Sequence, residues 1–285
     1  MIDDHCHPFA LEPGPLDLSH VSLELLDDPG AATRRARLRP TYLWHNLLRN
    51  RLARYLGVAL EELDAARAVA AADYRGYVRG LFADAALREL VMDPAWPPGA
   101  AAQVAQFEDL TGCPVHLLLR VEQVLDPLLE AEVGFDELVR RFDEQLEAAR
   151  TAGYRGFKTI LAYRTGLAVD VDTSAEAARR ALPGSGPLKR RAKPLRDFLT
   201  RRLLRYAADV GLPVQFHTGL GDSDIRLQDA NPLLLEDLLR TPEGTAAQVV
   251  LIHGSYPYHE EAAYLATARP NVYVDVSLFT SLPRG

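Results

Sequence analysis

The chain has 285 residues, of which 48% are hydrophobic and 25% are charged, a composition typical of a globular protein with one sizeable core. Its formal net charge of -7 excludes the strongly basic balance that favours nucleic-acid binding. Only two cysteines occur, Cys6 and Cys113, which argues against a disulfide scaffold and indicates a reducing compartment. Neither an apolar run of about 18 residues nor a basic-then-apolar leader is recognised, so we expect a cytoplasmic protein without a membrane span.

The first strand predicted from the sequence carries His5-Cys6-His7. Because strand side chains alternate between faces, His5 and His7 share a face. Their Cα atoms lie about 6.6 Å apart at ~3.3 Å rise per residue. Zinc–nitrogen bonds are about 2.0–2.1 Å long, so two imidazoles at this spacing can converge on one divalent ion. The alternative is a surface His-x-His pair near a frayed terminus.

Residues 30–88 are expected to form a helical insert after the first strand. Thr41 is a candidate N-cap for a helix that ends at Gly57, and further helices are expected over residues 61–72 and 74–87. The aromatic residues Tyr42 and Trp44 either reach over a site or, as we favour, pack the insert together.

From residue 89 onward, short apolar runs alternate with helical segments. The runs predicted as strands span residues 90–93, 115–121, 156–161, 213–217, 248–253 and 272–276. The segments predicted as helices span residues 100–110, 135–152, 188–210, 232–239 and 260–268. This alternation predicts parallel strands buried on both faces. With the first strand there are seven, so an open doubly wound sheet is possible, but we favour a single domain over residues 1–285 with an incomplete (β/α)8 TIM-type barrel.

Polar residues cluster at the carboxyl ends of the predicted strands, which favours the barrel because those ends share one rim. They are His7, Arg120, Arg164, His217 and His253. A single histidine that ends a strand is ordinarily a hydrogen-bonded core residue. Two on neighbouring strands, with His5 and His7 on the first, supply the imidazoles that zinc, iron or manganese can use. A site with three protein nitrogens and an open position is the catalytic type.

At these residues the chain resembles the amidohydrolase superfamily, specifically the amidohydrolase-related, FluG-type branch of metal-dependent TIM barrels. The resemblance is carried by His5-Cys6-His7, Gln215-Phe216-His217-Thr218-Gly219 and Leu251-Ile252-His253-Gly254. Gly156-Phe157-Lys158-Thr159-Ile160, Ala162-Tyr163-Arg164, Tyr256 to Ala262 and Asn271 to Ser277 are similar to the same branch. The resemblance covers nearly the whole chain. The set of histidines is specific evidence for the family, whereas each histidine alone is weak evidence.

The resemblance implies that His5, His7 and His217 bind a divalent metal, zinc being favoured over manganese or iron. It implies that His253 either binds a second ion or donates a proton to the substrate. Lys158 on the fourth strand is a candidate bridge between two ions, although it lies well before the end of its strand. The alternative is a lysine paired with a carboxylate such as Asp3, which shares the face of His5.

The family also has an aspartate at the end of an eighth strand, which holds the metal and takes a proton from the activated water. No eighth strand is recognised before Gly285, so we expect a C-terminally truncated member that lacks this general base. Asp275 is a less favoured stand-in, because it is predicted to lie in the middle of the seventh strand. We expect the missing strand, ending in Ser-Asp, to lie beyond Gly285.

The function implied is that of a metal-dependent hydrolase in which activated water attacks an amide-like C–N bond, with His253 stabilising or protonating the developing charge. Arg164 and Arg120 are candidates for holding a substrate carboxylate, and each can equally be a rim salt bridge. The alternatives are a metal-dependent non-oxidative decarboxylase of the same branch and a non-catalytic barrel that binds a partner. Expected partners are a small-molecule substrate, further copies of the chain or a glutamine-synthetase-like domain.

Overall fold

The computed structural model describes residues 1–14, 37, 43–95, 99–182, 187, 192–222 and 224–277. In this part of the chain, seven strands form one sheet in chain order, and each pairs in parallel with the next. They are β1 (Ile2–Cys6), β2 (Glu89–Met92), β3 (Val115–Arg120), β4 (Gly156–Thr159), β5 (Val214–His217), β6 (Val249–Ile252) and β7 (Val272–Val274).

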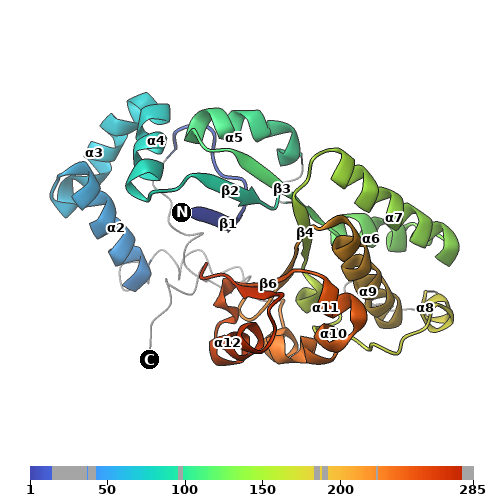
Figure 1. Ribbon diagram of the computed structural model, residues 1–285. Coiled ribbons are helices and arrows are strands. Elements are labelled where there is room, and N and C mark those ends of the chain that lie inside the picture. Colours follow the sequence, from blue (N-terminus) through green and yellow to red (C-terminus); the bar gives the residue numbers. More distant parts are fainter. Residues whose placement is uncertain are drawn as a thin grey trace.

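Helices connect successive strands, as parallel pairing requires. After β2 they are α5 (Val104–Thr111), α6 (Glu122–Glu130), α7 (Phe135–Thr151), α8 (Ala175–Ala181), α9 (Lys193–Val210), α10 (Glu236–Arg240), α11 (Pro242–Ala246) and α12 (His259–Ala268). Figure 1 shows the sheet curled, with these helices on its outer side. The described residues therefore form an incomplete TIM-type barrel, as the sequence predicted.

The helical insert after β1 is also present. It consists of α2 (Leu43–Leu56), α3 (Leu63–Ala70) and α4 (Tyr74–Asp84), and Gly57 follows α2 with a left-handed φ of 69°. The α4 helix lies beside α5 (Figure 1). The predicted N-cap Thr41 and the aromatic residue Tyr42 lie outside the described residues, as does the side chain of Trp44.

Several predicted elements have different boundaries in the structure, and two of these differences bear on the strand ends. The strand predicted over residues 156–161 ends at Thr159, because Leu161–Tyr163 forms a 3-10 turn. The strand predicted over 272–276 ends at Val274, which places Asp275 just past the strand rather than within it. The helix predicted from residue 188 is described from Lys193, because residues 188–191 lie outside the described part.

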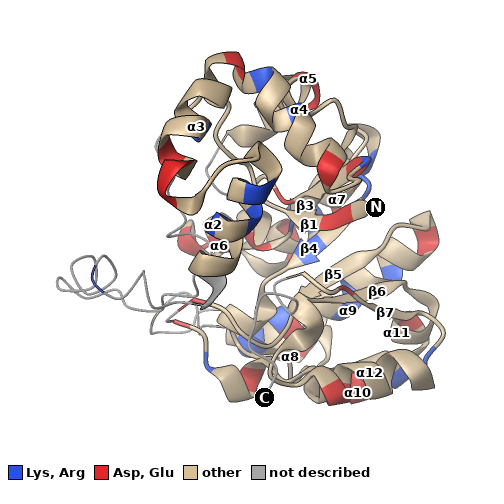
Figure 2. Ribbon diagram, turned by 90° about the vertical axis from the view of Figure 1, so that its left-hand side faces the viewer, with Lys and Arg blue, Asp and Glu red and all other residues tan. Residues whose placement is uncertain are grey.

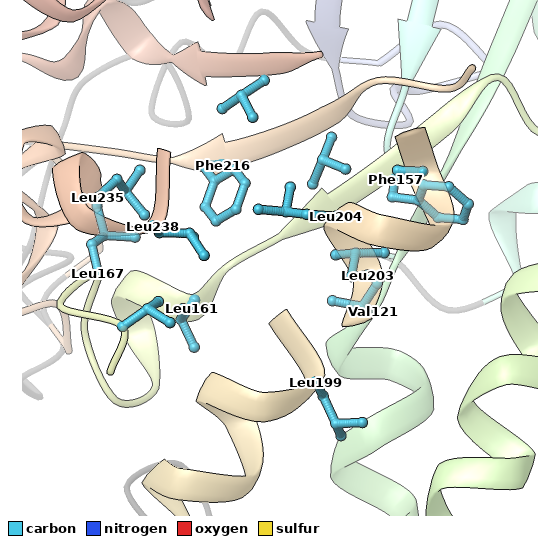
Figure 3. Packing of buried hydrophobic residues seen from close by; sticks show 14 of the residues in the cluster. Val121, Phe157, Leu161, Leu167, Leu199, Leu203, Leu204, Phe216, Leu235 and Leu238 are labelled. Carbon is cyan, nitrogen blue, oxygen red and sulfur yellow. The ribbon is translucent and has the colours of Figure 1, made fainter. Parts of the chain in front are cut away.

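The main core lies between the outer face of the sheet and the surrounding helices (Figure 3). Phe157 of β4 and Phe216 of β5 are fully buried there, with Leu203 and Leu204 of α9 in the same cluster. Because side chains alternate along a strand, the neighbouring residues Lys158, Gln215 and His217 project to the opposite, inner face. Packing of the outer face thus fixes which polar residues enter the barrel.

Acidic and basic residues are interspersed over the helices that Figure 2 presents. No described helix is long and apolar enough to cross a membrane.

We expect Leu204→Ala to reduce the free energy of unfolding by about 2–5 kcal/mol, because it removes buried methyl groups and leaves a cavity in a packed core. Urea denaturation followed by circular dichroism measures the change. The matched control is Val69→Ala, at a side chain that is 77% exposed, for which the change should stay within about 0.5 kcal/mol. Equal losses in the two variants would contradict the placement of the core.

Candidate metal centre and its surroundings

Four histidines lie together at the carboxyl ends of the strands. The ring centroids of His5 and His7 are 5.0 Å apart, those of His5 and His253 are 5.2 Å apart, and those of His217 and His253 are 4.8 Å apart. His5, His217 and His253 are buried, whereas His7 is exposed. The structure thus brings together the four side chains singled out from the sequence, although β1 and β5 are not neighbours in the sheet.

Hydrogen bonds fix the protonated nitrogen of two of these rings. The Nδ1–H of His5 donates to Gln215 Oε1 at 3.0 Å, and the Nδ1–H of His7 donates to the backbone carbonyl of Asp93 at 3.1 Å. Both partners are carbonyl oxygens, which only accept, so the hydrogen of each ring is on Nδ1 and Nε2 keeps its lone pair. Metal-binding histidines ordinarily have such a partner on the other ring nitrogen.

Gln215 is oriented by a second bond, in which its amide nitrogen donates to the backbone carbonyl of Asp4. This contact assigns the amide nitrogen and oxygen, because only the oxygen is then left for His5. Gln215 is buried and lies two residues before His217, on the same face of β5. No role for Gln215 was predicted from the sequence, although its i, i+2 spacing from His217 places both residues on one face of a strand.

His217, the third expected metal ligand, forms its hydrogen bond through Nε2 rather than through Nδ1. The Nε2–H of His217 donates to the backbone carbonyl of Leu220 at 3.0 Å, and the ring of Tyr163 packs on it with centroids 4.7 Å apart. Among the described residues, no three or more His, Cys, Asp or Glu side chains are arranged to hold a metal ion. The chemistry of the donors fits a transition metal, since the imidazoles are adjacent and two offer an unprotonated Nε2.

Lys158 lies on the inner face of β4 and is 1% exposed. Its Nζ has no hydrogen-bond partner among the described residues, so the alternative of an ion pair with Asp3 is wrong. Burial lowers the pKa of Lys158 to about 7, against the opposing influence of Asp93. The lysine is therefore easily neutralised, and its charge acts on the neighbouring histidines.

Burial also lowers the pKa of His5, His217 and His253 well below the ordinary value. The charge of Lys158 lowers the pKa of all three further. These imidazoles are accordingly neutral at neutral pH, which is the form that binds metal ions.

The two arginines expected to hold a substrate carboxylate are both in ion pairs. Arg120 places Nη2 2.6 Å and Nε 2.8 Å from Oδ2 of Asp93, which is fully buried. Arg164 Nη2 lies 2.9 Å from Oδ2 of Asp126, and Arg196 binds the other oxygen of that carboxylate. The structure therefore shows the salt-bridge alternative, and Asp93 links Arg120 to the carbonyl that holds His7.

Asp275 follows the last residue of β7 and is buried. Its Oδ1 accepts from the backbone N–H of Gly254 at 3.1 Å, and its Oδ2 accepts from the hydroxyl of Ser277. Ser277 Oγ lies 3.1 Å from Nδ1 of His253. Asp275 thus reaches the histidine cluster through a serine that the sequence analysis had not singled out.

Gly219 lets two strand ends approach each other closely. It has a φ of 68°, and a Cβ at this position would lie 2.3 Å from the backbone oxygen of Tyr256. The turn after β5 therefore packs against the segment after β6, which keeps His217 beside His253.

Comparisons with known proteins agree with this architecture. Protein fluG of Emericella nidulans is 41% identical over 135 residues, which cover 42% of this chain and 15% of that protein's length. The crystal structure of a proposed metal-dependent hydrolase from Lactobacillus casei ATCC 334 aligns with 98% of this chain and 74% of its own, with a TM-score of 0.79 and 29% identity. The family model for amidohydrolases (Amidohydro_2) matches residues 137–283, just over half of the chain. The protein therefore belongs to the amidohydrolase family.

Proposed function

We propose that the protein is a metal-dependent hydrolase that uses water to cleave an amide-like C–N bond. The observation that carries this proposal is the cluster of four imidazoles at the strand ends, three of them buried and held neutral. The similarity to a Lactobacillus casei protein described as a proposed metal-dependent hydrolase supports the same class of reaction.

The residues proposed to hold the ion are His5, His7 and His217, with zinc favoured over manganese or iron. A bound divalent ion supplies Lewis acidity, which activates water near neutral pH and polarises a substrate carbonyl. Gln215 and the Asp93 carbonyl keep the Nε2 atoms of His5 and His7 unprotonated. Each Nε2 could therefore coordinate an ion without prior loss of a proton.

His253 is proposed to act on the substrate rather than as a ligand. Its ring lies against His5 and His217, so a group bound beside those two rings is within its reach. A histidine there can stabilise or transfer a proton as charge develops. Lys158 and Asp3 are proposed to tune the charge of the site. Arg120 and Arg164 are proposed to contact a substrate carboxylate while they keep their ion pairs with Asp93 and Asp126.

We expect metal-free protein to bind one equivalent of Zn²⁺, and His217→Asn to weaken the affinity by more than about 100-fold. Gln215→Leu should weaken it by about 10–100-fold, the usual cost of removing a partner of a metal ligand. Isothermal titration calorimetry after chelator treatment measures both effects.

The matched control for these variants is His116→Gln. His116 lies on β3, bonds Glu89 at 2.8 Å and is outside the cluster, so its loss should leave the zinc affinity unchanged. If neither wild type nor His116→Gln holds stoichiometric zinc, manganese or iron, the metal-dependent proposal is wrong and a binding role is favoured.

The reaction type is tested by supplying the metal-loaded protein with a panel of amides and a panel of aromatic carboxylic acids. A hydrolase releases an amine from the amides and consumes water, whereas a decarboxylase releases carbon dioxide from the acids. We expect amine release, measured by chromatography, and its loss in His253→Gln. Carbon dioxide release without amine release would identify the decarboxylase alternative.

We expect Lys158→Met to stabilise the metal-free protein by a few kcal/mol at and below pH 7. The pKa of Lys158 is lowered from 10.5 to about 7 in the folded state, so its protonated form destabilises the fold at about 1.4 kcal/mol per pKa unit. Wild-type stability should rise from pH 7 toward pH 10.5, and this rise should be smaller in the variant.

Urea denaturation across this pH range, in the presence of chelator, gives the comparison. Lys193→Met is the control, because Lys193 is half-exposed and paired with Asp197, so its replacement should bring no gain. A Lys158→Met variant that is less stable than wild type at pH 7 would show that the amine has a partner in solution.

A further inference from the structure

The turn that carries His253 has an unusual backbone. His253, Gly254 and Ser255 have consecutive positive φ values of 67°, 54° and 53°. A residue other than glycine is strained in this region and persists there only where its surroundings hold it. Two of the three residues here are not glycine. The backbone conformation that positions His253 therefore destabilises the fold.

The contacts that hold the turn come from neighbouring strand ends. Ser255 Oγ lies 2.7 Å from Thr218 Oγ1, which itself donates to the backbone carbonyl of Ile252. The N–H of Gly254 donates to Asp275 Oδ1 at 3.1 Å. One oxygen of a buried carboxylate is thereby committed to the backbone of the turn.

The other oxygen of Asp275 determines the state of the His253 ring. An ionised carboxylate only accepts hydrogen bonds, so the hydroxyl hydrogen of Ser277 is directed to Asp275 Oδ2. Ser277 Oγ is then the acceptor in its 3.1 Å contact with Nδ1 of His253, and this nitrogen must carry the hydrogen. Nε2 of His253 is left with its lone pair.

We propose that Asp275, acting through Ser277, is a positioning residue for His253: one carboxylate oxygen holds the backbone of the turn, and the other sets the tautomer of the ring. The inference rests on the proposed hydrolase function for the role of His253. In this tautomer Nε2 is a proton acceptor, so His253 can take a proton before it gives one back. Proton acceptance is the role that the family resemblance implies for an aspartate at the end of an eighth strand.

The same contacts argue against Asp275 as the stand-in for that aspartate. Both of its oxygens already accept hydrogen bonds, one from Gly254 and one from Ser277. Metal coordination by Asp275 would compete with both bonds and release the turn that they hold.

The tautomer can be observed directly in metal-free protein labelled with ¹⁵N-histidine, by long-range ¹H–¹⁵N correlation spectra in which His253→Gln identifies the His253 signals. The measurement belongs well above the pKa of Asp275, which burial raises to about 6, so that the carboxylate is ionised. We expect wild type to show Nδ1 protonated and Nε2 unprotonated.

Three variants separate positioning from a general structural effect. Ser277→Ala removes the acceptor, so the Nδ1–H form should fall from the predominant to the minor species. Asp275→Asn places an amide N–H against Ser277, which frees the serine hydrogen for Nδ1, so the ring should switch to Nε2–H. Ser277→Thr keeps the hydroxyl and should restore the wild-type pattern, and Thr267→Ala, at an exposed hydroxyl on α12, should not change it.

A wild-type ring protonated on Nε2, or a wild-type pattern in both Ser277→Ala and Asp275→Asn, overturns the proposal. A change in Ser277→Ala without one in Asp275→Asn overturns the role given to Asp275. The spectra require neither metal nor substrate. They therefore stand if no hydrolysis is found, and a negative result here leaves the hydrolase proposal intact.

Discussion

One pair of hydrogen bonds crosses the interior of the curled sheet, and the candidate centre depends on it. Gln215 of β5 accepts from the His5 ring and donates to the backbone of Asp4, so it joins two strands that are four positions apart in the sheet. These bonds join the two strands across the interior of the sheet and leave the Nε2 of His5 unprotonated. Architecture and chemistry therefore depend on the same amide group.

Around this link, charge and burial act in the same direction. Burial lowers the pKa of three histidines, and the charge of Lys158, a buried lysine without a hydrogen-bond partner among the described residues, lowers it further. Burial of Lys158 destabilises the fold, but its charge helps to keep the neighbouring imidazoles neutral. The side chain of Asp93 is in an ion pair with Arg120, and the backbone carbonyl of Asp93 accepts the hydrogen bond from His7. The rings of His5 and His7 are thus each held by a partner on Nδ1.

The parallel sheet, the insert and the meeting of the histidines could be predicted from the sequence, because strand periodicity decides which residues share a rim. The α6 helix was missed because Pro127 lies inside it, and proline ordinarily indicates a helix end. The expected partner of Lys158 was wrong, since strand alternation gives the face of a side chain but not its hydrogen bonds. Asp275 was predicted to lie within the seventh strand, but it lies just past the end of β7. Residue patterns specify the ends of an element less sharply than its existence.

The position of β1 in the described sheet has a consequence for how the histidine cluster comes apart. In the described sheet β1 pairs only with β2, and its residue Ile2 is 55% exposed, yet β1 carries His5 and leads directly into His7. Strands with few neighbours open at lower free energy than those in the interior of a sheet. Within the described sheet, local opening of β1 would therefore separate His5 from Gln215 while β4, β5 and β6 remain paired with one another.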